Sequence, residues 1–322
     1  MDKSGAKKRS WLRIALQWAL ALLVLWFVFR RLGGDWPTIR PKLHQIGWGW
    51  LLVSILPGLA YFFLRAEAWR RILAGWQLHP PFLRTFSVWA KAEALRFVPG
   101  TVWAVVGRIT QAQQLGTTKT ICTASIVVEA VLMVCSAGLL ATGLALGVLQ
   151  QVIIPSWLVI VIFCSAVLLS LGTFFQKPLA GIVRLFHRLL RREGESAGYA
   201  LKGAVSYGIL LLAWISFAAF QVLVARAFGF ANTGSSVAIF SVAFLASWLL
   251  GYVTVFAPSG LGVREAVVAA LLSPVVGAPS ALFLAAVTRV ALIVIELIAL
   301  CVAIGVRPVP LTPPSSTAST HA

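Results

Sequence analysis

The sequence predicts an all-α polytopic membrane protein, a bundle of about seven full transmembrane helices and two Pro/Gly-broken re-entrant hairpins arranged as a possible inverted repeat. Hydrophobic residues make up 60% of the 322-residue chain and charged residues only 11%. Several apolar runs approach the ~20 residues that a helix needs to cross a bilayer. Two further apolar stretches are broken by proline and glycine beside charged residues, which indicates a polar site inside the membrane.

The apolar runs predict seven crossings in chain order. They cover residues 12–30, 48–70, 121–149, 154–175, 205–228, 236–257 and 281–305. The domain organisation follows from them. Residues 1–11 form a basic cytoplasmic N-terminus, residues 12–307 form the transmembrane domain, and residues 308–322, rich in Pro, Ser and Thr, form a disordered tail.

Two segments are too short or too interrupted to be ordinary crossings. Segment 82–118 is broken at Pro99 and Gly100, and segment 258–279 is broken by prolines and glycines that begin with Pro258. We expect both to be re-entrant hairpins. Discontinuous segments at corresponding positions in two halves of a transporter are a sequence indication of its binding site.

The excess of 27 Lys and Arg over 9 Asp and Glu flanks the apolar spans instead of forming one soluble patch. It therefore sets orientation in a membrane and does not indicate nucleic acid binding. The connection 176–204 carries six basic residues, whereas 150–153 and 229–235 carry none. This asymmetry predicts a bacterial inner-membrane protein with a cytoplasmic N-terminus. The connection 30–47 is also basic, but counting the predicted crossings from a cytoplasmic N-terminus places it on the outer side of the membrane.

No pattern indicates a metal, a cofactor or a catalytic centre. The four cysteines lie in apolar spans without ligand spacing, and the four histidines lie in connections or in the tail. The sequence shows no nucleophile beside a base, no acidic pair suited to a sugar nucleotide, and no phosphate-binding Gly-rich loop with its lysine. We therefore expect a protein that is not an enzyme.

Charged side chains at membrane depth are the candidate site residues. Each costs roughly 2.5 to 3.5 kcal/mol at a lipid-facing helix centre, so we expect them to face protein, water or one another. The set comprises Glu93, Arg96, Arg108, Glu129, Arg226, Arg264, Glu265, Arg289 and Glu296. Four more charged residues lie at a helix end, namely Arg65, Glu67, Arg70 and Arg71. Glu67 can pair with Arg70 and Arg71 along one helix, and this set is interpreted as an interfacial cluster.

The late motif, APSGLGVRE, is the more specific of the two. Its last helix breaker is Gly262, so a helix is expected to begin at about Val263. The unpaired N–H groups and the dipole of that terminus favour an anion, and Arg264 adds a forked donor suited to phosphate. Glu265 points elsewhere, either toward Arg289 or as a capping carboxylate.

These considerations assign a role to each candidate. Headgroup binding is expected at Arg96, Arg108, Arg264 and Arg289. Ion coupling or pairing is expected at Glu93, Glu129, Glu265 and Glu296. The hairpin breaks themselves are formed by Pro99, Gly100, Gly107, Pro258, Gly260 and Gly262. If both breaks border one cavity, Arg96 or Arg108 is expected to face Glu265 across it.

The two motifs resemble the transmembrane-region family of lysylphosphatidylglycerol synthases, also called flippase-like domain proteins. RFVPGTVWAVVGR resembles the family's Pro-Gly motif followed by Gly-Arg, and APSGLGVREA is similar to its late Pro-x-Gly-x-Gly-x-x-Glu signature. YFFLRAEAWRRIL resembles its early Arg-x-x-x-Trp pattern. The resemblance covers about residues 10–305. The matching signature positions are Pro99, Gly100, Arg108, Pro258, Gly260, Gly262 and Glu265.

The resemblance implies an integral inner-membrane protein that moves or presents an amphipathic lipid. The lipid classes implied are an anionic phospholipid, an aminoacylated lipid, a hopanoid and a polyprenyl-phosphate-linked glycan. The chain carries no soluble synthase domain of the kind found in true lysyl-lipid synthases, so their catalytic activity is not expected. The leading hypothesis is a lipid translocator driven by the lipid gradient or by ion coupling.

Two alternatives remain open. The first is a non-transporting accessory protein that binds lipid and presents it to a glycosyltransferase or a lipid-modifying synthase. The second, with weaker support, is a membrane-embedded transferase that uses a lipid-linked donor.

Overall fold

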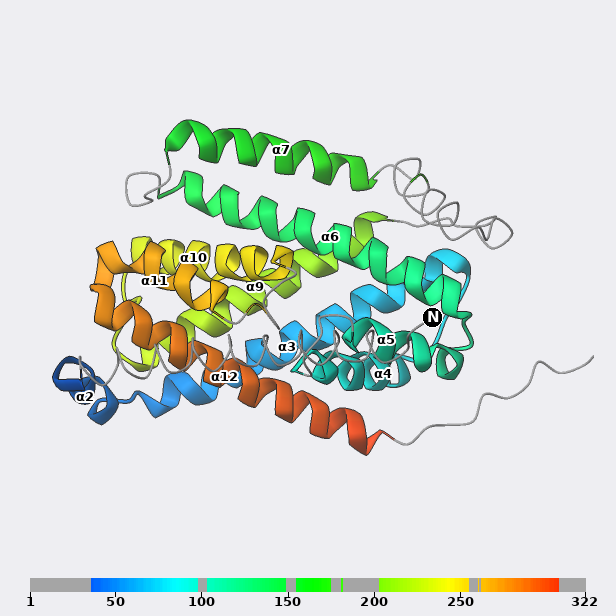
Figure 1. The fold of residues 1–322 in the computed structure, drawn as a ribbon, viewed down its shortest axis with the longest axis horizontal. Coiled ribbons are helices and arrows are strands. Elements are labelled where there is room, and N and C mark those ends of the chain that lie inside the picture. The colour runs from blue at the N-terminus through cyan, green and yellow to red at the C-terminus, as the bar shows by residue number, and fades with distance from the viewer. Residues whose placement is uncertain are drawn as a thin grey trace, which may run out of the picture.

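The structure is a computed structural model. It describes residues 36–97, 103–148, 155–174, 181, 203–254, 260 and 262–306. Every regular element within these residues is helical. The predicted all-α membrane bundle is therefore confirmed (Figure 1).

Five helices of the described part of the chain are long and apolar enough to cross a membrane. They are α3 (Trp48–Leu73), α6 (Lys119–Leu146), α9 (Gly203–Ala227), α10 (Gly234–Val253) and α12 (Ala278–Gly305). A shorter apolar helix, α7 (Ser156–Phe174), corresponds to the expected crossing at 154–175. The expected crossing at 12–30 lies outside the described residues, so the count of seven stays a prediction.

Side-chain caps fix where two of the long helices begin. The Thr118 hydroxyl accepts a hydrogen bond from the backbone N–H of Ile121 at the start of α6. Thr233 and Ser236 form a reciprocal capping box at the start of α10. Such caps satisfy N–H groups that have no partner within the helix, and these are costly to leave unpaired near a membrane.

The first broken segment forms the expected hairpin. It comprises α4 (Phe82–Ala94), the short helix η2 (Leu95–Phe97), α5 (Trp103–Thr110) and η3 (Ala112–Leu115). Helices α4 and α5 pack against each other and occupy the end of the bundle where α3 terminates (Figure 1). Residues 98–102, which include the predicted breakers Pro99 and Gly100, lie outside the described residues.

The second broken segment differs from the expected hairpin. Segment 258–279 contains a single helix, α11 (Val263–Val276), and α12 already begins at Ala278. The hairpin is instead formed by α10 and α11, which pack against each other, so α10 is an arm of this hairpin and not the separate crossing expected at 236–257. Pro274 is accommodated inside α11 and does not end it. Pro258 lies outside the described residues.

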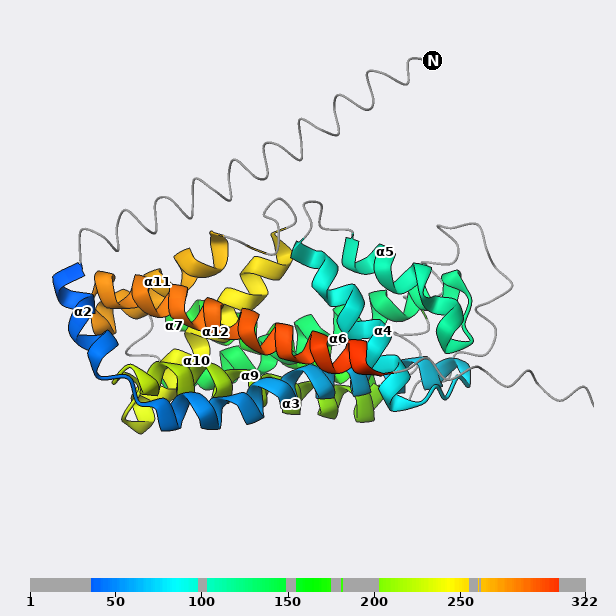
Figure 2. The same cartoon turned by 90° about the horizontal axis from the view of Figure 1, so that it is seen from below.

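The two hairpins enter the bundle from opposite ends of its long axis. In Figure 1, α4 and α5 lie toward one end and α10 and α11 toward the other. In Figure 2, the described ends of α4 and α10 approach each other near the middle of the bundle. This is the arrangement that an inverted pair of re-entrant hairpins produces.

The segment 36–44 was expected to be part of a connection and is a short helix, α2 (Trp36–His44). It contacts α12 and lies at the end of the bundle where α3 begins (Figure 1). The uncharged turn between α9 and α10 lies at that same end. The described residues of the connection 30–47 therefore lie at the end of the bundle that the order of the helices predicts. The basic charge of this connection would have predicted the opposite end.

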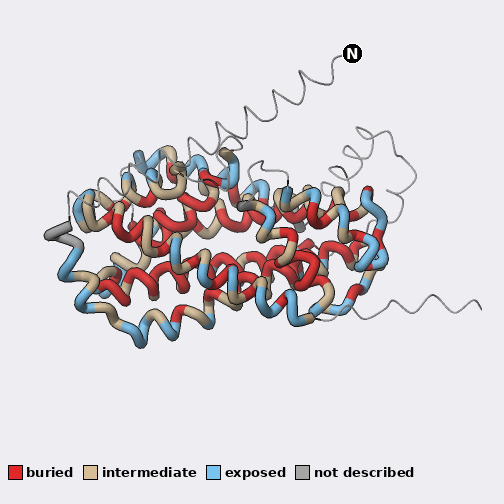
Figure 3. The backbone as a smooth tube through the Cα atoms, turned by 60° about the horizontal axis from the view of Figure 1, so that its bottom comes forward, coloured by how far each residue is buried: buried red, intermediate tan, exposed pale blue. Residues whose placement is uncertain are grey.

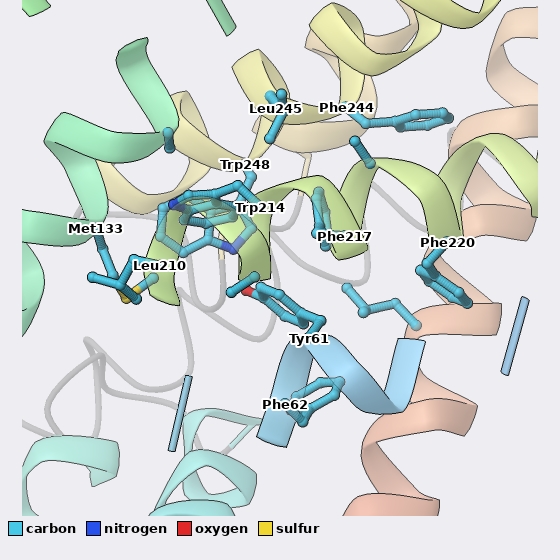
Figure 4. Close-up of a cluster of buried hydrophobic side chains, with 14 of the residues drawn as sticks. Tyr61, Phe62, Met133, Leu210, Trp214, Phe217, Phe220, Phe244, Leu245 and Trp248 are labelled. Carbon is cyan, nitrogen blue, oxygen red and sulfur yellow. The ribbon is translucent and has the colours of Figure 1, made fainter. Parts of the chain in front are cut away.

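Buried aromatic side chains join α3, α9 and α10 behind the hairpins. Figure 4 shows Tyr61, Trp214, Phe217 and Trp248 gathered in one cluster, and Figure 3 shows buried residues along the inner faces of the helices. The rings of Trp214 and Trp248 meet edge to face with centroids 4.4 Å apart. The Trp214 indole N–H also donates to Ser136 on α6 at 3.0 Å. Edge-to-face pairs and satisfied indole groups hold these helices in fixed positions.

Glycines bring the arms of each hairpin close together. Gly260 has φ +68°, and a Cβ there would lie 2.8 Å from the carbonyl oxygen and 2.9 Å from the Cα of Gly251 in α10. Since both neighbours are backbone atoms, they cannot rotate away. In the first hairpin, a Cβ on Gly107 would lie 3.2 Å from the Cβ of Ala92. Both motif glycines therefore serve close backbone packing.

Replacing Gly260 with alanine should destabilise the second hairpin. The Gly260→Ala methyl group meets backbone atoms and the residue keeps a positive φ, so we expect a melting temperature several degrees below wild type. The matched control is Gly208→Ala on α9, where a Cβ has no neighbour within 4 Å. Thermal melting in detergent measures both variants. Equal melting of the two would show that the α10–α11 contact is not as close as described.

The two ends of the bundle should face opposite sides of the membrane. Asn232 and Gln114 are both exposed and lie in connections at opposite ends. In a background without native cysteines, Asn232→Cys should react with a membrane-impermeant maleimide in intact cells. Gln114→Cys should react only after permeabilisation, because the basic connections are expected in the cytoplasm. Labelling of both positions from the same side would overturn this topology.

Candidate functional site

A cavity of about 390 Å³ lies between the two hairpins. This volume falls within the range of small-molecule and cofactor sites. Both hairpins and the long helices α3 and α6 contribute to its wall. The lining residues are Arg65, Glu93, Arg96, Ala104, Val105, Arg108, Ile126, Glu129, Ala130, Met133, Trp248, Gly251, Tyr252, Thr254, Gly260 and Arg264.

Shared ion pairs form the wall on the side of the first hairpin. Arg108 on α5 bonds to Glu129 on α6 and lies 3.5 Å from Glu93 on α4. Arg65 on α3 lies 3.4 Å from Glu93 and 3.5 Å from Glu129. All four side chains are at most 12% exposed. The two carboxylates therefore hold four helices together around the cavity.

Arg96 extends this network to α12. It lies 2.7 Å from Glu93 and forms an ion pair with Glu296, whose side chain is 8% exposed. From the sequence, Glu296 was expected to need a partner from another segment, and the structure supplies Arg96. The contact fixes the last described turn of the first hairpin against the C-terminal helix.

Arg65 is a site residue to which the sequence analysis gave no role. It was named only as a charged residue at a helix end, but it is 4% exposed and lines the cavity. Its guanidinium stacks 4.7 Å from the Trp89 ring centroid and donates to the Tyr61 hydroxyl at 3.4 Å. A signal was available, since Arg65 shares a helical face with Tyr61 and Trp69, both large and buried.

The interfacial cluster of Glu67, Arg70 and Arg71 pairs as its spacing predicted. Glu67 accepts from Arg70 and from Arg71, each at 2.6 Å, on the outward side of α3. The Arg71 side chain is half exposed. These residues lie apart from the cavity wall and so provide surface controls for experiments on the site.

The start of α11 follows the sequence prediction closely. The helix begins at Val263, and the Glu265 carboxylate accepts the Gly262 N–H at 2.7 Å. The other Glu265 oxygen lies 4.0 Å from Nε of Arg289 on α12. Both expected roles of Glu265, as a cap and as a partner of Arg289, are therefore present together.

Arg264 occupies a slot formed by two glycines of the second hairpin. A Cβ on Gly251 would lie 2.5 Å from its Cγ, and a Cβ on Gly260 would lie 2.9 Å from its Nε. The guanidinium lies 5.7 Å from the Trp248 ring centroid. No carboxylate in the described residues comes within 4 Å of it. Buried Arg264 Nε also lacks a hydrogen-bond partner there.

The expected charge pair across the cavity is not formed. Arg96 and Arg108 were expected to face Glu265, but both are paired with carboxylates on α4, α6 and α12. Glu265 is held at its own helix terminus and by Arg289. Local carboxylates therefore satisfy the first hairpin, and the positive charge that remains near the cavity belongs to Arg264.

A second, smaller cavity of about 20 Å³ adjoins Arg264 on the side away from the first hairpin. Its wall includes Glu265, Thr288 and Arg289 as well as Gln221 of α9. The Gln221 side-chain oxygen is buried and has no partner in the described part of the chain. The volume is sufficient for one water molecule, and Gln221 is a further polar residue that the sequence analysis missed.

The structure brings eight of the nine charged candidates around these two adjoining cavities. Five of them line the larger cavity, namely Glu93, Arg96, Arg108, Glu129 and Arg264. Glu265 and Arg289 line the smaller one. Glu296 reaches the site through Arg96. Their roles toward lipid stay predictions, and Arg226 lies elsewhere, donating to the Ala231 carbonyl.

The sequence model described as "Lysylphosphatidylglycerol synthase TM region" matches residues 14–299. No curated protein matches the chain significantly. The family match includes both hairpins, the residues that line the cavity between them and, of the five long apolar helices in the described residues, all but the last turns of α12. The chain is therefore a multi-pass membrane protein and belongs to the lysylphosphatidylglycerol synthase transmembrane region family.

Proposed function

We propose that this protein is a lipid translocator that admits the phosphate of a lipid headgroup into the cavity between its two hairpins. Membership of the family connects the chain with membrane lipids. The observation that carries the proposal is the position of Arg264, which lines the cavity and has no carboxylate partner in the described residues.

Arg264 is half-buried, and a partly desolvated charge without a carboxylate partner in the described residues favours an anionic ligand. Removing a guanidinium from water without a counter-ion costs several kcal/mol even after relaxation. A phosphate would offset this cost, because the planar guanidinium fork matches phosphate oxygens in two parallel hydrogen bonds. The N-terminus of α11, which begins one residue before Arg264, adds a favourable dipole for an anion.

Apolar residues beside the cavity provide a surface for the lipid tails. Leu95, Trp103 and Val106 of the first hairpin are exposed at the bundle surface. Tyr252 and Val253 of the second hairpin are exposed as well, and Tyr252 also lines the cavity. This combination suits an amphipathic ligand whose headgroup lies in a polar cavity while its chains remain in the bilayer.

Opposed hairpins also suit movement across the membrane. The two hairpins line the cavity from opposite ends of the bundle, so displacement of one or the other would change which side of the membrane the site faces. The sequence contains no ATP-binding motif, which leaves the lipid gradient or an ion gradient as the driving force. In the structure Glu129, Glu265 and Glu296 are all ion-paired, and their role in coupling stays a proposal.

The remaining features of the proposal follow from the family and the charge distribution. We place the protein in the bacterial inner membrane with a cytoplasmic N-terminus, where basic residues favour the anionic leaflet. Translocation involves no covalent step, so the protein is proposed not to be an enzyme. A glycosyltransferase or a lipid synthase is the proposed partner, as a source or consumer of the translocated lipid.

Replacing Arg264 or neutralising Glu265 should abolish lipid movement without unfolding the protein. Purified protein in liposomes should expose tail-labelled phosphatidylglycerol to an external quencher, and Arg264→Ala and Glu265→Gln should lose this activity. Glu265→Gln keeps an oxygen that can accept the Gly262 N–H, so the cap is preserved. Melting temperatures should remain near wild type.

The matched control is Arg70→Ala, which removes an arginine from the surface cluster on α3. It should keep full activity. Retained movement in both site variants would exclude the second hairpin as the headgroup site. Saturable lipid binding by a wild type that moves no lipid would instead favour the accessory role of lipid presentation.

A further inference from the structure

We propose that the cavity selects headgroups with a single negative charge and excludes headgroups that carry an ammonium group. This inference rests on the proposed function, because it assumes that the headgroup enters this cavity. It adds a substrate class that follows from the charge balance of the site.

The site has one more positive charge than negative charges. Five arginines surround the two adjoining cavities, namely Arg65, Arg96, Arg108, Arg264 and Arg289. Four carboxylates face them, namely Glu93, Glu129, Glu265 and Glu296. Every carboxylate lies within 4 Å of at least one arginine, and Arg264 is the arginine without one in the described residues.

The hairpin tips do not alter this balance. Residues 98–102 and 255–259 contain no Asp, Glu, Lys or Arg, and neither does position 261. The undescribed residues that adjoin the cavity-lining residues along the chain therefore supply no charged side chain. A ligand with one negative charge would make the site neutral, which is the favoured state in a low-dielectric environment.

Among the described residues that line the cavity, no carboxylate is free to bind an ammonium group. Glu93 is shared by Arg65, Arg96 and Arg108, with contacts between 2.7 and 3.5 Å. Glu129 is shared by Arg65 and Arg108. A cationic headgroup would therefore lie among arginines whose partners are already taken. Such an uncompensated like charge is a means by which a site rejects a wrong ligand.

A second negative charge on the ligand is also disfavoured. It would require a second available cation, yet Arg289 lies beside Glu265 and the other arginines are held by Glu93, Glu129 and Glu296. The fitting ligand is thus a phosphodiester with a neutral polar substituent. A diacylglycerol lipid and a polyprenyl lipid can both carry that group. Zwitterionic, lysyl-modified and neutral headgroups fit less well.

The test compares lipids that share the same labelled acyl chains and differ only in the headgroup. Phosphatidylglycerol carries one negative charge, phosphatidylcholine has no net charge, and lysyl-phosphatidylglycerol has a positive charge. Transport of phosphatidylglycerol in proteoliposomes should exceed that of the other two by at least about tenfold, as close charge pairs couple strongly. Melting in nanodiscs of each lipid gives an independent measure of binding.

Variants of Arg264 test whether the excess charge causes the preference. Arg264→Lys keeps the charge and should retain the preference at a lower rate, because a point charge replaces a fork. Arg264→Gln should reduce phosphatidylglycerol transport to the level of phosphatidylcholine. The control Arg70→Gln should leave the ratio unchanged. An unlabelled polyprenyl phosphodiester that inhibits transport would identify a polyprenyl ligand, and no inhibition would identify a diacyl ligand.

The outcomes separate this inference from the proposed function. Equal transport of all three lipids would overturn the selectivity while leaving translocation intact. No transport of any lipid would overturn translocation, and the melting data would then decide the selectivity. Greater stabilisation by phosphatidylglycerol would support charge selection in binding, whereas equal stabilisation by all three lipids would overturn it.

Discussion

The sharing of two buried carboxylates among three arginines is the interaction on which the cavity depends. Glu93 and Glu129 bring Arg65 of α3, Arg96 of η2 and Arg108 of α5 to one place. Buried ion pairs recover the cost of desolvation only when the geometry is good and the remaining polar atoms are satisfied. Here the pairs interlock across separate helices, so the first hairpin can remain at membrane depth with most of its charges compensated.

The second hairpin is held in a different way. Its arms meet through the backbone contact of Gly260 with Gly251, and its helix α11 is capped by Glu265. These devices use backbone groups and one carboxylate, and they position Arg264 without neutralising it. The contrast suggests a division of roles, in which the first hairpin supplies a charge-balanced wall and the second supplies the group that meets a ligand.

The sequence predicts the local features of this site well and its long-range contacts poorly. The start of α11 and the cap by Glu265 follow from helix breakers and a three-residue spacing, which are local rules. The burial of Arg65 and the pairing of Glu296 with Arg96 depend on helices far apart in the chain. Spacing alone cannot select among several possible partners for one charge. The same limit explains why Glu265 was wrongly expected to face the first hairpin, and why Gln221 was missed.

The central claim is that Arg264 is the one uncompensated charge of an otherwise paired site in the described residues. Melting of two matched variants in neutral detergent tests it most directly, since methionine removes the charge and keeps much of the side-chain volume. Arg264→Met should melt at or above the wild-type temperature, because it removes a half-buried charge that has no carboxylate partner in the described residues. Arg96→Met should melt well below it, since a broken buried pair costs about 3–5 kcal/mol and Glu296 loses its arginine. Equal destabilisation by both variants would show that Arg264 has a counter-ion within the protein and would contradict the account.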